Sequence, residues 1–250
     1  MKISFVIPVY KSYELLTRCI NSIVSQVGNL DVEIIIVDDT PPVLSQSILE
    51  WAEKYSYIKI IRNSRNMGVT YSRNKGWFLA CGDYVIFLDS DDLLIDGSLE
   101  IIFNDIIETN LDCYLFRTVN LNNKLVGMVL ERQRFDSYFL LTDTYNTGER
   151  LLCIRKTNGK PFIGVFRGHE FAGLLRYIST IDHFKSIDAG YPARIYCNDN
   201  ASSISNGCEL RRRKQPLIKG HAYTAKKMFE FGHYYSAFLW LLRLIKAKYL

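Results

Sequence analysis

The chain has 250 residues, of which 48% are hydrophobic and 23% charged, and its formal net charge is +5. This length and apolar content are enough to bury a substantial core, which excludes a largely disordered protein. No uninterrupted apolar run reaches the roughly 18 residues of a membrane-spanning helix, and the six cysteines form no CxxC pair, so an integral membrane protein, a zinc site and a disulfide framework are not expected. A reducing, cytoplasmic compartment fits this pattern.

Roughly the first 110 residues alternate short apolar runs with amphipathic stretches, which is typical of βαβ units in a mostly parallel α/β sheet. The predicted strands are Ile3–Val9, Val32–Val37, Ile58–Arg62 and Tyr84–Leu88. The predicted helices, with apolar residues at spacings of three and four, are Tyr13–Gln26, Leu44–Tyr55, Val69–Ala80 and Gly97–Thr109. The first run is too short for a secretory signal and contains Pro8, so we interpret it as a strand.

The pattern weakens after Asp112. Two further strands are predicted at Cys113–Asn120 and Lys124–Glu131, and residues 136–164 show no clear periodicity. A helix is predicted at Glu170–Ile178 and an amphipathic helical region at Gly220–Leu250. We therefore divide the chain into residues 1–110, 111–208 and a C-terminal tail of residues 209–250.

Three carboxylates, Asp89, Asp91 and Asp92, directly follow the predicted strand that ends at Leu88. This position is the carboxyl edge of a parallel sheet, where open α/β folds bind ligands. Crowded carboxylates repel one another unless a cation neutralises them, and oxygen ligands suit Mg²⁺ or Mn²⁺ carrying a diphosphate. The alternative is a helix start, in which one aspartate acts as an N-cap, but this accounts for one carboxylate and not three.

Two other segments are predicted to reach the same edge of the sheet. Asp38 and Asp39 follow the strand VEIIIV, although aspartates are also common in ordinary turns. In NMGVTYSRNKG, Gly68 permits close backbone approach and Arg73 projects from the start of a helix toward an anion. The segment therefore supplies a positive charge near two acidic groups.

The ordered motifs FVIPVYKSYELLTRCINSIVSQ, VDD, NMGVTYSRNKG and FLDSDD resemble glycosyltransferase family 2, whose members are inverting enzymes. The resemblance covers about the first 110 residues. It implies a GT-A fold, with a Rossmann-like βαβ half that binds the nucleotide and a mixed central sheet, followed here by a C-terminal helical region. It also implies a UDP-sugar donor and a Mn²⁺ or Mg²⁺ cofactor.

The resemblance assigns roles to individual residues. Pro8, Tyr10 and Asp39 would line the nucleoside pocket, with Asp39 recognising the uracil. The remaining donor-binding positions would be Asp38, Asn66, Gly68 and Arg73. Asp89 and Asp91 would form the DxD pair, Asp89 near the ribose and Asp91 on the metal, while Asp92 would face the donor sugar.

The family's general base is usually the aspartate of a Glu-Asp pair before a helix, and this sequence has no such pair there. The best match is RGHEF, which places Glu170 at the base position with His169 as a competing base. The alternative is that both residues are simply the polar start of a helix. The segment YCNDNASSISNG resembles a loop that closes over the diphosphate in relatives, with Asn200 in place of a histidine and Ser202, Ser203 and Ser205 as phosphate contacts.

The tail from Glu209 onward contains ten Lys or Arg against two Glu, a local charge of +8, whereas the preceding residues sum to −3. A basic tail on an acidic body indicates an anionic partner. Arg211–Lys214 would neutralise a diphosphate or a lipid head group, and YYSAFLWLLRLIKAKYL suits a helix in a membrane interface. The alternative is a helix packed on the core or on another subunit.

The leading hypothesis is a transferase that moves a hexose or N-acetylhexosamine from a UDP-sugar to a glycan acceptor. The resemblance favours a lipid-linked acceptor in bacterial surface polysaccharide synthesis, with the enzyme peripheral at the inner face of the plasma membrane. A sugar-nucleotide pyrophosphorylase is disfavoured because VIPVYKSYE has no glycine-rich loop. A nucleotide-sugar-binding protein without catalysis stays an alternative because the Glu-Asp pair is missing. Nucleic-acid binding is not expected, since no recognised motif is present.

Overall fold

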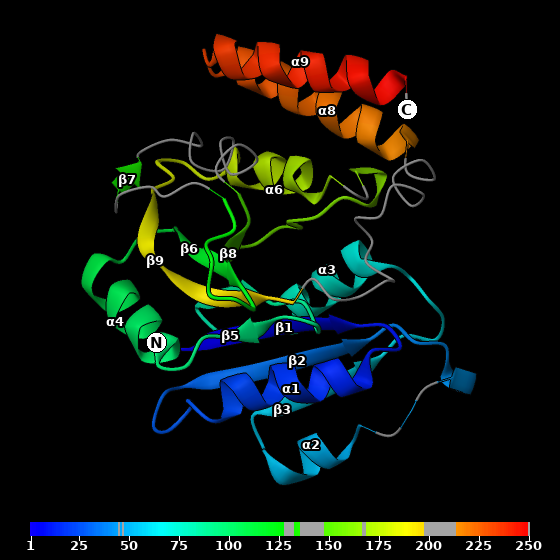
Figure 1. Ribbon diagram of the computed structural model, residues 1–250, viewed down its shortest axis with the longest axis vertical. Coiled ribbons are helices and arrows are strands. Elements are labelled where there is room, and N and C mark those ends of the chain that lie inside the picture. The colour runs from blue at the N-terminus through cyan, green and yellow to red at the C-terminus, as the bar shows by residue number, and fades with distance from the viewer. Residues whose placement is uncertain are drawn as a thin grey trace.

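A computed structural model describes residues 1–44, 46, 48–127, 133–135, 148–166, 169–197 and 214–249. They form a mixed sheet covered by helices, and a helical hairpin lies outside one of the helical layers (Figure 1). The strand order is β3-β2-β1-β4-β8-β6-β9-β5, with β7 (Gln133–Phe135) paired to β9. The sheet therefore continues across the boundary that we expected near residue 110.

The first half of the sheet is parallel and agrees with the predicted βαβ pattern. Its strands are β1 (Ile3–Val9), β2 (Val32–Asp38), β3 (Ile58–Arg62) and β4 (Tyr84–Phe87). Its principal helices are α1 (Tyr13–Val24), α3 (Val69–Leu79) and α4 (Ser98–Thr109). Because these strands are parallel, the residues that follow them meet at one edge of the sheet.

Two predicted elements differ from the structure. The helix expected over Leu44–Tyr55 is confined to α2 (Glu50–Lys54), and a 3-10 turn occupies Pro42–Leu44. The strand expected over Lys124–Glu131 is wrong for its described part, where Leu125 makes an isolated bridge with Val119. Both predictions were based on apolar residues in short segments. In the structure these segments contain turns and bends.

The second half of the sheet contains strands that the periodicity did not reveal. β6 (Cys113–Asn120) was predicted, but β8 (Arg150–Arg155), β9 (Ser186–Tyr196) and β5 (Leu93–Leu94) were not. β8 inserts antiparallel between β4 and β6, and β9 runs parallel to β6. These pairings join distant segments to the strand that precedes the acidic cluster.

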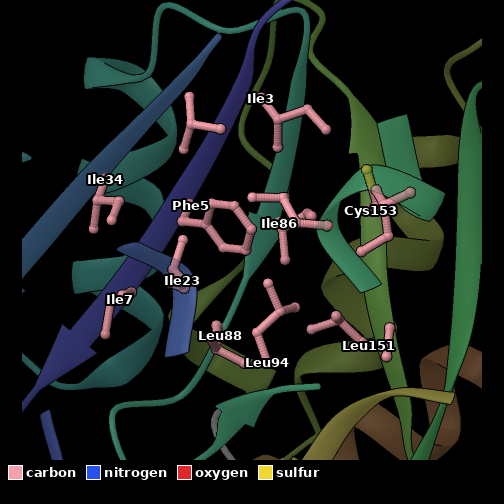
Figure 2. Packing of buried hydrophobic residues seen from close by; sticks show 14 of the residues in the cluster. Ile3, Phe5, Ile7, Ile23, Ile34, Ile86, Leu88, Leu94, Leu151 and Cys153 are labelled. Atoms are coloured by element: carbon pink, nitrogen blue, oxygen red, sulfur yellow. The ribbon is translucent and has the colours of Figure 1, made fainter. Parts of the chain in front are cut away.

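The core has one apolar layer on each face of the sheet. On one face, α1 and α4 pack on β1, β2 and β4; Figure 2 shows Phe5 between Ile34 and Ile86. On the other face, Trp77 of α3 belongs to a cluster that reaches Trp240 in the C-terminal hairpin. Gly76 allows α3 to lie close to β1, because an added Cβ would stand 2.3 Å from a methyl carbon of Val6.

The C-terminal hairpin packs on α6 (Glu170–Ile178) and consists of α8 (Lys214–Glu230) and α9 (Tyr234–Lys248) (Figure 1). The predicted amphipathic region is thus two helices, separated by a turn in which Gly232 has a φ of 79°. None of the described helices combines the length and the apolar character needed to span a bilayer.

Candidate functional site

An acidic loop, defined here as Asp89–Asp92, follows β4 at the carboxyl edge of the parallel strands. The Arg73 guanidinium of α3 contacts Asp89 at an N–O distance of 2.5 Å. Burial alone would raise the pKa of Asp89, but the positive charge of Arg73 holds it below its ordinary value. The structure therefore brings together the acidic cluster and the cation that the sequence analysis placed near it.

Asp92 points away from solvent and differs in this from Asp91, which is partly exposed. Its carboxylate pairs with Arg194 of β9 at 3.2 Å. Burial raises the pKa of Asp92 to about 7 against the opposing charge of Arg194, and Asp89 and Asp91 add to the rise. Helix capping does not explain the cluster, because α4 begins six residues beyond Asp92 with Gly97 at the N-cap position.

Asp39 organises the loop that leads into α3. Its carboxylate accepts hydrogen bonds from the Asn63 side chain at 2.8 Å and from the backbone N–H groups of Met67 and Gly68, both at 2.7 Å. Gly68 has a φ of 87°, which favours glycine at this position. The VDD and NMG motifs thus meet in space although about 28 residues separate Asp39 from this loop.

Asp38 is fully buried and lies beneath the same edge of the sheet. It accepts hydrogen bonds from the Tyr13 hydroxyl at 3.1 Å and from the backbone N–H of Thr40 at 3.0 Å, and Arg62 lies 3.5 Å from it. These contacts tie β2 to α1 and β3. Three other predicted donor-site residues lie nearer the surface, and they are Pro8 (half-buried), Tyr10 (exposed) and Asn66 (exposed).

α3 also positions the segment that precedes Glu170. The Asn74 amide exchanges two hydrogen bonds with the backbone of Phe162, at 2.9 and 3.1 Å, and the Trp77 indole donates to the Gly159 carbonyl at 3.1 Å. Burial alone would lower the pKa of Arg73, but the carboxylates of Asp89, Glu170 and Glu149 raise it. Glu170, the first residue of α6, therefore contributes to the electrostatic environment of Arg73.

His169 faces the C-terminal hairpin. Its Nε2 lies 3.1 Å from the Thr224 hydroxyl of α8, and its ring centroid is 4.9 Å from that of Trp240 on α9. Burial, reinforced by His221 and Arg243, lowers the pKa of His169 to about 3. The imidazole is thus neutral near pH 7 and forms part of the helix packing.

Several predicted contacts fall outside the described residues. These are Asn200, Ser202, Ser203, Ser205 and Arg211–Arg213. Two charged residues at the site were missed by the sequence analysis, namely Arg194 and Glu149. Arg194 lies in a strand that periodicity did not reveal, and Glu149 lies just before another, so no sequence signal pointed to either.

The fold is similar to that of solved TarS structures. Residues 1–349 of S. aureus TarS align with 91% of this chain, over 65% of the TarS chain, with a TM-score of 0.66 and 17% identity. A TarS structure described as a complex with UDP-GlcNAc aligns with 92% of this chain, over 73% of its own, with a TM-score of 0.63 and 17% identity. The fold is GT-A, as predicted.

Residues 4–180 match the family model described as Glycosyl transferase family 2. The chain belongs to this family. The match extends beyond the motifs recognised in the sequence, because it includes β6, β8 and α6.

Two of the similar proteins are named as bacterial glucosyltransferases. A poly(ribitol-phosphate) β-glucosyltransferase of Bacillus spizizenii is 36% identical over half of this chain and a fifth of its own length. WfgD of Escherichia coli, named as a UDP-Glc:α-D-GlcNAc-diphosphoundecaprenol β-1,3-glucosyltransferase, is 26% identical over 86% of this chain and 85% of its own. The chain spans less than a third of the length of the Bacillus spizizenii enzyme and of two other relatives.

Proposed function

We propose that the chain is a glycosyltransferase that inverts the anomeric centre as it moves a hexose or N-acetylhexosamine from a UDP-sugar to a lipid-linked glycan. The observation that carries the proposal is the Arg73–Asp89 pair beside Asp91, with Glu170 in the electrostatic environment of the same arginine. The name of WfgD, which aligns over most of both chains, supports the UDP-sugar and the lipid diphosphate acceptor.

Pro8, Tyr10 and Asp39 are the proposed nucleoside contacts. A carboxylate has roughly four lone-pair positions, and Asp39 uses three of them on Asn63, Met67 and Gly68. One position is left for the uracil N3–H. Asp38 is buried beneath this edge of the sheet and is proposed to support these contacts, while Asn66 and Gly68 are proposed to complete the donor site with Arg73.

Asp91 and Asp89 are the proposed ligands of Mn²⁺ or Mg²⁺. Among the described residues, no group of three or more His, Cys, Asp or Glu side chains is arranged to hold an ion by itself. This donor set fits these metals, because they are commonly held by one or two carboxylates together with substrate phosphates. When bound, the metal supplies positive charge to the departing diphosphate.

The protein's own residues supply the other requirements of a single displacement. Arg73 places a fixed positive charge beside the diphosphate, and its contact with Asp89 sets its position. Glu170 accepts the proton of the acceptor hydroxyl as that oxygen attacks the anomeric carbon from the side opposite UDP. Since α3 holds both Arg73 and the segment before α6, one helix sets the spacing between donor and base.

Thermal unfolding in the presence of nucleotide sugars tests the proposal. At 100 times its Kd, a donor stabilises the folded state by about 2.7 kcal/mol, which corresponds to a rise in Tm of roughly 5–10 °C for a protein of this size. We expect this rise with a UDP-sugar and Mn²⁺, and not with GDP-mannose or ADP-glucose at equal concentration. Absence of a shift with a panel of UDP-sugars would contradict the proposed donor.

We also propose that the hairpin touches an anionic membrane. One face of α9 packs on α6 and α8 through Ala237 and Trp240, yet the opposite face is also apolar. The exposed residues of this outer face are Tyr234, Tyr235, Phe238, Leu241, Leu242 and Ile245, and Phe229 near the end of α8 is also exposed. Lys226, Lys246 and Lys248 are exposed on the same two helices, a combination suited to an interface with acidic lipids.

Vesicle sedimentation tests this contact. The double variant Phe238→Ser, Ile245→Ser should bind phosphatidylglycerol-containing vesicles at least about tenfold more weakly, because burial of each side chain contributes on the order of 1.5–3 kcal/mol. Val43→Ser is the matched control, since Val43 is an exposed apolar residue far from the hairpin in sequence. Unchanged sedimentation of the double variant, or self-association without vesicle binding, would exclude the lipid surface.

A further inference from the structure

The segment after the acidic loop is bound to a strand from the far end of the fold. β5 pairs antiparallel with β9, with Leu94 opposite Arg194, and the Ile95 N–H donates to the Ala193 carbonyl at 2.9 Å. β9 pairs in turn with β6. The acidic loop is therefore held from β4 on one side and from β9 on the other.

Arg194 makes this connection through its side chain as well. Its Nη1 lies 3.2 Å from Asp92, its Nε donates to the Thr118 hydroxyl at 3.0 Å, and its Nη2 donates to Glu149 at 3.1 Å. The Arg194 side chain is only 7% exposed. Because a guanidinium is planar with fixed donor directions, it sets the relative positions of three separate segments.

Asp92 has little freedom once this pair has formed. Its side chain is 1% exposed, and the Cys197 N–H also approaches its other oxygen at 3.4 Å. The residue directly before it, Asp91, is the proposed metal ligand. A shift of Asp92 would therefore move Asp91, since one peptide unit joins them.

We infer that Arg194 is a positioning residue for the donor site. It fixes Asp91 by holding Asp92, and it links the acidic loop to Glu149, the residue before β8. The inference rests on the proposed function, because it assumes that Asp91 and the UDP diphosphate share a metal ion. It adds a residue that lies outside all four motifs of the family resemblance. Arg194 touches neither substrate in this assignment and acts through Asp92.

The test measures UDP affinity by calorimetry, once with Mn²⁺ and once with EDTA. The ratio of the two affinities is the gain that Mn²⁺ provides. Arg194→Met should lose most of this gain and should lower kcat/KM for the donor about 100-fold, as expected when a supporting residue lets a ligand move. Arg194→Lys keeps the charge but cannot reach three acceptors, so we expect a loss of about tenfold. If Arg194→Met does not fold, Arg194→Lys alone tests the inference.

Arg117→Met is the matched control. Arg117 is a buried arginine on β6, paired with Asp188 at 3.7 Å, and lies one residue before Thr118. We expect it to lower Tm while the Mn²⁺-dependent gain stays within about twofold of the parent's, because the Arg117 side chain pairs with Asp188 and not with Asp92. Equal Mn²⁺-dependent gains in the parent and both Arg194 variants would overturn the inference. Failure of the parent to bind UDP would instead overturn the proposed function.

Discussion

Asp91→Asn is expected to reduce transfer about 10²–10³-fold, the loss typical of removing one group that stabilises developing charge. The substitution keeps the shape of the side chain and removes its charge, so the Mn²⁺ concentration needed for half-maximal rate should rise. The measurement is initial transfer rate from a UDP-sugar against Mn²⁺ concentration. Asp96→Asn is the matched control, because Asp96 is exposed in the turn before α4.

The stability of the same variant separates a functional role from a structural one. Asp89 and Asp91 both oppose ionisation of Asp92, so the folded state carries mutual repulsion among the three carboxylates. Removal of one charge should leave Tm unchanged or raise it while activity falls. Full transfer activity in Asp91→Asn, or loss of activity only through unfolding, would contradict the assignment of Asp91.

The βαβ half could be predicted because each of its strands and helices can be recognised from the pattern of its own residues. Ile3–Val9 and Val32–Asp38 are apolar almost throughout, as strands buried on both faces must be. A parallel arrangement then forces Asp39 and Asp89 to the same edge, whichever side chains surround them. The family resemblance made these predictions more specific and added Glu170.

The second half could not be predicted because its strands depend on distant partners. β9 contains Gly190 and Pro192 and shifts register against β6, so its alternation is broken. A charged residue such as Arg194 in such a segment suggests a surface position. Its burial depends on partners that lie far away in sequence, among them Asp92 and Thr118.

The contacts of His169 could not be predicted for the same reason, because they are made with a distant segment of the chain. The sequence placed His169 and Glu170 together as alternative bases, because adjacent residues at a helix start share a neighbourhood. An added Cβ at Gly220 would stand 2.4 Å from the His169 ring, so α8 packs directly on the imidazole. Which of the two side chains faces the acceptor depends on a hairpin more than 40 residues further along the chain.

Glu170→Gln is expected to reduce transfer by about 10²–10⁴-fold while UDP affinity is retained, because a general base acts on the acceptor and not on the donor. Glutamine keeps the size of the side chain but cannot take up the proton. The measurements are single-turnover transfer rate and UDP binding by calorimetry. Glu108→Gln is the matched control, an exposed glutamate near the end of α4.

His169 is a poor base for this step, since burial and the neighbouring His221 and Arg243 lower its pKa to about 3 and proton acceptance weakens accordingly. His169→Gln should therefore lower Tm through lost helix packing and keep a transfer rate within about tenfold of the parent's at a temperature where it is folded. The opposite pattern, with Glu170→Gln active and a folded His169→Gln inactive, would assign the base to His169. The two variants together decide which neighbour at the start of α6 accepts the proton.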